Sequence, residues 1–113
     1  MICVKKRTLQ EFIHEGKFKI CFNGFYDYAQ FDEAIKIYTK DIGAVCTKSS
    51  MGFYDSASSV TLIEGIELQW SFDNWVCIEL SYSNPYDDVA ISKIKKWAEV
   101  IFSRLVDKFG ENG

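Results

Sequence analysis

The sequence predicts an α+β domain, in which a mostly antiparallel sheet of about five strands has helices packed on one face, in the order α-β-α-β-β-β-β-α. Two patterns predict this class. Three segments between residues 59 and 82 alternate apolar and polar side chains, whereas residues 28–42 and 87–109 repeat apolar side chains every three or four positions. The chain has 113 residues, of which 48 % are apolar. This size and composition suit a single globular domain over residues 1–113.

The N-terminal part predicts a short helix followed by a strand. Thr8 and Glu11 have the T-x-x-E spacing of a capping box, in which each side chain bonds the free backbone N–H of the other residue. Gly16 would end this helix. Residues 17–22 (KFKICF) alternate polar and apolar side chains, as a half-buried strand does. We therefore expect a helix over 8–15 and a strand over 17–22.

A longer helix is predicted over residues 28–42. Asp27 can cap its N-terminus, and Gly43 would close its C-terminus. Its apolar residues form one stripe: Phe31, Ala34, Ile35, Tyr38 and Ile42. A short apolar strand over 44–47 and a polar, glycine-containing loop over 48–55 are expected to follow.

The clearest pattern predicts a three-stranded meander over residues 59–63, 66–72 and 75–82. Its connections, Glu64-Gly65 and Asp73-Asn74, have the chemistry of two-residue hairpin turns. In the second strand Ile66, Leu68, Trp70 and Phe72 alternate with Glu67, Gln69, Ser71 and Asp73. We expect the apolar set to face the core and the polar set to face water.

The longest helix is predicted over residues 87–109. Asp87 and Asp88 suit the positive N-terminal end of a helix, and Lys108 suits the negative C-terminal end. Gly110 would end the helix. The expected buried stripe consists of Ile91, Ile94, Ala98, Ile101, Phe102, Leu105 and Phe109.

Targeting features and cysteines together predict a cytoplasmic location. A short apolar stretch at residues 2–4 precedes the basic cluster Lys5-Lys6-Arg7, which reverses the order of a secretory signal. No apolar run approaches the roughly 20 residues that span a bilayer. The four cysteines form no C-x-x-C motif, so we expect reduced structural thiols; they are Cys3, Cys21, Cys46 and Cys77.

Charge is distributed unevenly along the chain. The net charge is −3, but no Lys or Arg occurs between Lys48 and Lys93, a stretch that holds seven acidic residues. A field of one sign accelerates encounter with an oppositely charged partner, and aromatic side chains beside it can anchor a protein interface. The candidate partner-binding residues are therefore Asp55, Glu64, Glu67, Asp73, Glu79, Tyr54 and Trp75. The alternative is that these acids only keep the protein soluble.

The sequence offers no recognisable catalytic set. His14 is the only histidine, and its place near the end of the first predicted helix favours a surface role. The phosphate-loop, dinucleotide and calcium-loop motifs are missing. The basic groups Lys5-Lys6-Arg7 and Lys93, Lys95, Lys96 are too small to predict a nucleic-acid surface, and we expect both to be solvated. We therefore expect no enzyme activity, no cofactor, no metal, and neither nucleic acid nor membrane as a direct partner.

The segment FDEAIKIYTKDIGA, the meander GIELQWSFDNWVCIELSY and the one-sided charge resemble the immunity proteins of bacterial polymorphic toxins, including those of contact-dependent growth inhibition. The resemblance covers residues 17–109. It implies stoichiometric binding to a cognate toxin, often a basic nuclease domain, whose active site or substrate groove is blocked. The acidic surface would then imitate the phosphates of the toxin's substrate.

Two other functions stay open from the sequence. One is a small-molecule-binding domain or enzyme, which needs a concave apolar pocket with converging polar groups between the sheet and the helices. The other is an accessory protein that pairs with itself through the outer sheet face or a sheet edge. For the immunity function we expect a monomer or a weak homodimer.

Overall fold

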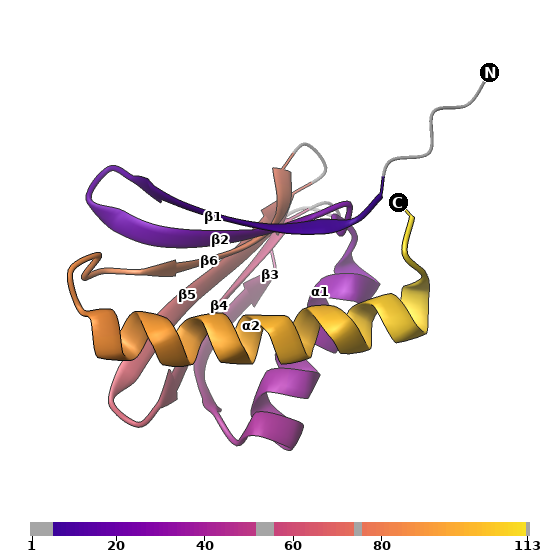
Figure 1. The fold of residues 1–113 in the computed structure, drawn as a ribbon. Helices are drawn as coiled ribbons and strands as arrows, with labels where there is room; N and C mark the ends of the chain where they lie inside the picture. Colours follow the sequence, from indigo (N-terminus) through magenta and orange to yellow (C-terminus); the bar gives the residue numbers. More distant parts are fainter. Residues whose placement is uncertain (1–5, 52–55, 74–75, 113) are drawn as a thin grey trace.

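The computed structural model describes residues 6–51, 56–73 and 76–112 (Figure 1). Its elements in chain order are β1 (Thr8–His14), β2 (Lys17–Asn23), α1 (Tyr28–Lys36), its π-helical continuation η1 (Ile37–Ile42), β3 (Val45–Met51), β4 (Ser56–Ile63), β5 (Ile66–Asp73), β6 (Val76–Tyr82) and α2 (Asp88–Phe109). The strands form one sheet in the order β1-β2-β6-β5-β4-β3, and every neighbouring pair is antiparallel. The predicted α+β class is confirmed. The described residues form six strands instead of five, because the first predicted helix is a strand.

The predicted helix over residues 8–15 is wrong. Strand β1 occupies this segment and pairs along its whole length with β2, from Thr8 opposite Asn23 to His14 opposite Lys17. The T-x-x-E spacing favours a helix only locally, whereas β1 is in register with β2 over all seven residues, and alternate residues exchange backbone hydrogen bonds with it. Tertiary pairing therefore overrides the local signal.

A Glu-Gly dipeptide makes the turn between β1 and β2. Glu15 and Gly16 both have positive φ, 53° and 74°, which is the conformation of a type I′ hairpin turn. Glu64 and Gly65 repeat it between β4 and β5, with φ of 51° and 77°. The sequence predicted a hairpin turn at Glu64-Gly65. The same dipeptide at Glu15-Gly16 could therefore have indicated the β1–β2 hairpin.

Strand β3 is longer than predicted. It continues to Met51 through the segment expected to be a loop, because Lys48, Ser49 and Ser50 pair with Val60, Ser59 and Ser58 of β4. A bulge lies between Cys46 and Lys48. Serine and lysine are poor strand formers, so pairing with β4 and not intrinsic propensity explains this extension.

Both helices follow their predicted signals. The Asp27 side chain accepts a hydrogen bond from the Gln30 backbone N–H, and Gln30 completes the capping box. Gly43, with φ of 102°, ends the helical segment. The Asp87 side chain caps α2 by accepting from Ala90 N–H, and α2 ends at Gly110.

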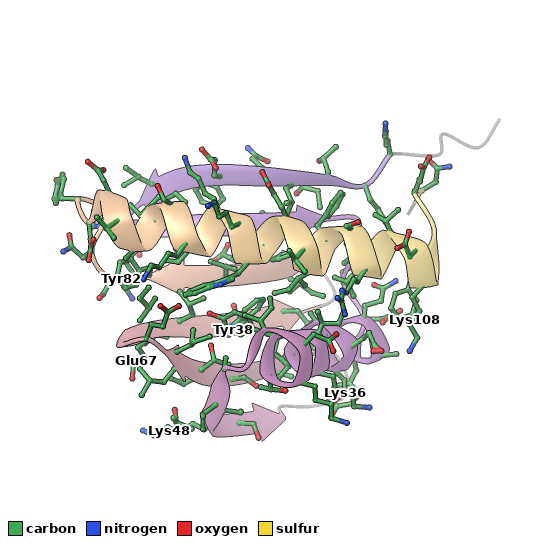
Figure 2. The ribbon with its side chains drawn as sticks, turned by 60° about the horizontal axis from the view of Figure 1, so that its bottom comes forward. Lys36, Tyr38, Lys48, Glu67, Tyr82 and Lys108 are labelled. Carbon is green, nitrogen blue, oxygen red and sulfur yellow. A yellow bond between two sulfur atoms is a disulfide. The ribbon has the colours of Figure 1, made fainter. Side chains whose placement is uncertain are left out.

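The two helices lie side by side on one face of the sheet (Figure 2). Helix α2 buries its predicted stripe, with Ile94, Ile101 and Leu105 fully enclosed. Helix α1 contributes Phe31 and Ala34 to the same core. The sheet contributes its inward side chains to this core, including Phe18, Ile20, Phe22, Leu68, Trp70, Phe72, Ile78 and Leu80. The opposite side of the sheet, which neither helix covers, is called the open face below.

The basic cluster Lys5-Lys6-Arg7 was expected to be solvated, but Arg7 is buried. Its side chain is buried against the end of α2, where Nη1 donates to the carbonyl oxygens of Phe109 (2.8 Å) and Gly110 (3.0 Å) and Nε donates to that of Gly24 (3.0 Å). The guanidinium also lies 4.3 Å from the centre of the Phe25 ring. Unpaired carbonyls and the negative end of the α2 dipole thus surround the cation.

A disulfide joins Cys21 of β2 to Cys77 of β6, with the two Cα atoms 6.2 Å apart. The expectation that these two cysteines are reduced is therefore wrong for the structure as it stands. The reason is the sheet order, which places two strands that are 56 residues apart in the sequence next to each other. Cys46 is a free, exposed thiol.

Candidate functional site

The structure describes only part of the predicted acidic site. Tyr54, Asp55 and Trp75 lie outside the described residues. Asp73 is the last residue of β5, where the backbone register places it opposite Ser56 of β4. The positions of Glu64, Glu67 and Glu79 are fully described.

Two of these three glutamates already have cationic partners. Glu79 Oε1 lies 2.9 Å from Lys19 Nζ of β2, and only 17 % and 19 % of the two side chains are exposed. Glu64 Oε1 lies 3.1 Å from Lys93 Nζ of α2. Both lysines come from segments outside the lysine-free stretch, and the sheet and helix packing brings them to the acids. The charge of Glu79 is therefore largely neutralised within the fold, whereas Glu64 belongs to a half-exposed surface pair.

Glu67 differs from the other two glutamates. It is exposed on the open face, and no described cation lies within ion-pair distance of it. Leu62 of β4 is its direct cross-strand neighbour, and Val45 of β3 is the next residue in the same row. Leu62 is 41 % and Val45 62 % exposed. The row Val45-Leu62-Glu67, called the β3–β5 row below, thus combines two exposed apolar side chains with an available carboxylate.

The open face carries both signs of charge, so the expectation of a purely acidic field is wrong for the described residues. Lys17 of β2 and Glu67 of β5 line the same shallow hollow, together with Gln69, Ser81 and Ser83. Lys48 of β3 pairs with Val60, which places it on this face as well. The prediction treated the lysine-free stretch as one surface, but the neighbouring strands β2 and β3 supply the missing cations.

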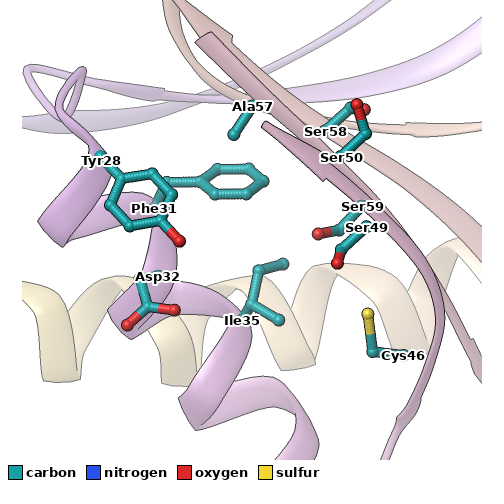
Figure 3. Close-up of a pocket in the computed structure, with 10 residues that line it drawn as sticks. All are labelled: Tyr28, Phe31, Asp32, Ile35, Cys46, Ser49, Ser50, Ala57, Ser58 and Ser59. Atoms are coloured by element: carbon teal, nitrogen blue, oxygen red, sulfur yellow. The ribbon is translucent and has the colours of Figure 1, made fainter. Parts of the chain in front are cut away.

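A groove on the helix side of the sheet separates α1 from β3 and β4 (Figure 3). Its volume is about 180 Å³. Its lining consists of Tyr28, Phe31, Asp32, Ile35, Cys46, Ser49, Ser50, Ala57, Ser58 and Ser59. Sequence reasoning selected none of these as site residues, although a pocket between sheet and helices was one of the open alternatives.

The groove exists because the inward side chains of β4 are small. Ala57, Ser59 and Thr61 face α1 where the neighbouring strand β5 presents Phe72, Trp70 and Leu68. Helix α1 packs on the large β5 side chains, as the 5.0 Å separation of the Phe31 and Phe72 ring centres indicates. The short β4 side chains leave space beneath the outer side of the helix.

The polar groups of the groove come from both of its walls. Asp32 lies on the α1 wall and forms an ion pair with Lys36, whose Nζ is 3.0 Å from Oδ2. The hydrogen bond that Lys36 donates to Asp32, together with the negative charge of Asp32, raises the pKa of Lys36 above its ordinary value. Figure 3 shows the Ser49 and Ser59 hydroxyls pointing into the groove from the opposite wall. The free thiol of Cys46 lies at the lower end of that wall.

Tyr38 of η1 is the most enclosed polar side chain near the junction of the two helices. Its ring packs against Trp70 and Trp97, with ring centres 5.3 Å and 5.9 Å apart. Its hydroxyl is buried and has no hydrogen-bond partner among the described residues. Burial, assisted by the negative charge of Glu64, raises the pKa of Tyr38 well above its usual range. The hydroxyl is therefore held neutral, and its surroundings are those of a core residue.

Metal-ligating and membrane-spanning features are not found in the described part of the chain. No group of three or more His, Cys, Asp or Glu residues there has the geometry to hold a metal ion. His14 is an exposed residue at the end of β1, with Nε2 3.7 Å from Glu15. Neither described helix is long and apolar enough to cross a membrane.

Comparison of the chain with protein families, with curated proteins and with solved structures finds no match. Two features of this fold are candidates for binding: the β3–β5 row on the open face and the groove beside α1.

Proposed function

We propose that this chain is an immunity-type protein that binds and neutralises a cognate bacterial toxin through the open face of its sheet. The observation that carries the proposal is the β3–β5 row, in which exposed Val45 and Leu62 lie next to the unpaired carboxylate of Glu67. Apolar side chains beside an available charge are typical of protein interfaces.

The dimensions of the open face suit a protein partner. Six strands at roughly 4.8 Å spacing, each about seven residues long at roughly 3.3 Å per residue, form a surface of about 25 by 23 Å. A standard interface buries roughly 800 Å² of accessible surface on each partner, so this face, about 575 Å² in projection, would supply most of such an interface.

The proposed partner is a toxin domain, such as a basic nuclease, that places a cation opposite Glu67; because the open face carries both signs, recognition would depend on this local match and not on a net acidic field. Glu79 and Glu64 are already paired with lysines, so the described residue that can attract such a partner is Glu67. Lys17 and Lys48 on the same face favour an acidic group on the partner opposite them, which would fix its orientation. Within this proposal the chain has no catalytic role, binds neither nucleic acid nor membrane directly, and is a monomer or a weak homodimer.

A cytoplasmic location belongs to the same proposal. The Cys21–Cys77 disulfide is the feature of the structure that opposes this location, because disulfides are rare in a reducing compartment. Thiol alkylation in intact cells followed by mass spectrometry distinguishes the states: two alkylated residues support the cytoplasmic location, and a protected disulfide contradicts it.

The test begins with the partner retained by the tagged protein in its native cells after washes at low and high salt. Affinity and association rate are then measured for the wild type, Glu67→Lys and Leu62→Ser. We expect each substitution to weaken binding at least tenfold, and Glu67→Lys to slow association as well. The same charge reversal at Glu99, which is exposed on α2 on the helix side, is the matched control. Unchanged affinity in both open-face variants would exclude this face as the interface.

A further inference from the structure

We propose that the groove between α1 and β3–β4 binds a small organic cation, whose ammonium group is held by Asp32 and whose hydrocarbon part packs on Tyr28 and Phe31. The groove lies on the helix side of the sheet, so this site is independent of the proposed protein interface. The proposal depends on the charge, the ring positions and the size of the groove.

The charge of the groove favours a cation. Asp32 is the one carboxylate among its lining residues, and none of these residues is Lys, Arg or His. The other polar lining groups, including the Ser49 and Ser59 hydroxyls, can accept hydrogen bonds from an ammonium group. An anionic ligand would meet the carboxylate of Asp32, and the nearest cation, Lys36, is already paired with that carboxylate.

Two aromatic rings form the apolar part of the site. Figure 3 shows Tyr28 and Phe31 next to each other on the α1 wall, across the groove from Ser49 and Ser59. Phe72 of β5 supports both rings, since its ring centre is 6.5 Å from that of Tyr28 and 5.0 Å from that of Phe31. Tyr28 is 43 % exposed and can offer its ring face to a cation, whereas Phe31, only 3 % exposed, forms the apolar floor against which the hydrocarbon part ends.

Lys36 already occupies one side of Asp32, but this ion pair can be exchanged. The two side chains are 56 % and 43 % exposed and lie four residues apart on α1. Exposed pairs of this kind contribute little stability, because water screens both charges. A ligand ammonium that also packs on the rings makes more contacts than Lys36 does and can displace it.

The size of the groove limits the ligand. A volume of about 180 Å³ is below the range of roughly 300–1,000 Å³ typical of drug-sized ligands. The occupant is therefore the size of an amino-acid side chain. Both a free amine and the lysine side chain of another polypeptide have this chemistry.

The experiment is a titration of the ¹⁵N-labelled full chain, followed by NMR, with benzylamine, benzyl alcohol and benzoate as probes. These three share one ring and differ in charge. We expect benzylamine to shift the amide signals of Asp32, Ile35 and Ser59, and the other two to bind at least tenfold more weakly. Capped lysine (N-acetyl-lysine methylamide) distinguishes the sources: binding as tight as that of benzylamine favours a polypeptide lysine, and weaker binding favours a free amine.

Two variants test the roles of the residues. Asp32→Asn should weaken benzylamine binding about tenfold, because it removes the charge-assisted hydrogen bond but keeps the side-chain shape. Tyr28→Leu, at a half-exposed position, should weaken it by a smaller factor through loss of the ring. Asp41→Asn is the matched control, since Asp41 lies in η1, pairs with Arg104 and does not line the groove. Equal binding of benzyl alcohol, unchanged affinity in Asp32→Asn, or no shift with either cation would overturn the proposal.

Discussion

The two edges of the sheet are covered differently, although both lie beneath a helix. At the β1–β2 edge, α2 packs on large inward side chains such as Phe18, Ile20 and Phe22, and the buried Arg7 closes the end of the layer. At the β3–β4 edge, α1 lies over Ala57 and Ser59, and a groove remains. Space remains at both edges, since a hollow of about 230 Å³ lies between β1 and α2, where Glu11 and Lys95 line it. The difference is that the inward row of β2 is filled with large side chains, whereas that of β4 is small. The β1–β2 edge, with its filled row and Arg7, is called the sealed edge below, and the β3–β4 edge is called the open edge.

Arg7→Met tests the sealed edge and should have the largest effect. Methionine keeps the bulk of the side chain, but the carbonyl oxygens of Gly24, Phe109 and Gly110 lose their donors. We expect the free energy of unfolding to fall by about 3 kcal/mol, since hydrogen bonds to charged groups contribute roughly 1.5–3 kcal/mol each and water replaces part of the loss. Urea denaturation measures this change.

Lys6→Met is the matched control for Arg7→Met. It removes the same charge from the adjacent residue, which is exposed, and should change the free energy of unfolding by less than about 0.5 kcal/mol. Equal effects of the two substitutions would mean that net charge, and not the buried guanidinium, stabilises this edge.

Thr61→Val tests why β4 keeps small polar side chains at the open edge. Thr61 is buried, and its hydroxyl accepts a hydrogen bond from Trp70 Nε1 at 2.9 Å. Valine has a similar shape but leaves the indole N–H unpaired, so we expect a loss of about 1–2 kcal/mol in the free energy of unfolding. Thr61→Ser retains the hydroxyl and should keep the indole fluorescence of Trp70 closer to that of the wild type. A stable Thr61→Val protein would show that this hydrogen bond does not constrain β4.

Tyr38→Phe tests the junction between the two edges, where α1 and α2 meet. The buried hydroxyl lacks a described partner, so its removal should leave stability at pH 7 unchanged or raise it by up to about 1 kcal/mol. Burial raises the pKa of Tyr38, so the folded state retains its proton while the unfolded chain loses it. This group therefore adds no pH dependence below pH 10, where both states hold the proton, and the free energy of unfolding falls as pH rises above 10 toward the folded pKa.

The prediction for Tyr38→Phe is checked by measuring the free energy of unfolding as a function of pH. Between the two pKa values the wild type should lose up to about 1.4 kcal/mol per pH unit through this group, and Tyr38→Phe should lose correspondingly less. Tyr86→Phe, at an exposed position, is the control and should follow the wild type. Parallel curves for all three proteins would show that the Tyr38 hydroxyl has access to water.

The sequence predicted the elements that have a strong pattern of their own. The meander, the α1–η1 segment and α2 are confirmed, because their alternating or three-to-four spacing coincides with burial in the core. Strand β1 and the second half of β3 were missed, because each is held by its partner strand against a local helix or loop signal. A strand that is stabilised mainly by pairing with its neighbour is difficult to predict from its own sequence pattern.

The candidate site was harder to predict than the fold. The distribution of charge along the chain identified Glu64, Glu67 and Glu79, but it could not show that Lys93 and Lys19 form ion pairs with the first and the last of them. Val45 and Leu62 become neighbours of Glu67 only through strand register. The burial of Arg7 depends equally on distant partners, since the carbonyl oxygens of Phe109 and Gly110 are more than 100 positions away in the sequence.

The ion pair between Lys95 of α2 and Glu11 of β1 lies at the β1–β2 edge. Among the predictions, its removal should change the free energy of unfolding least. Nζ lies 3.0 Å from Oε1, and the two side chains are 43 % and 53 % exposed. A double-mutant cycle with Lys95→Ala and Glu11→Ala should give a coupling of about 0.3–0.5 kcal/mol, which decreases at high salt. Arg7→Met should cost several times as much at the same edge, because its guanidinium is buried and hydrogen-bonded. A coupling above about 1 kcal/mol would instead mean that surface charge holds β1 against α2, and the sealed edge would then be expected to loosen in salt.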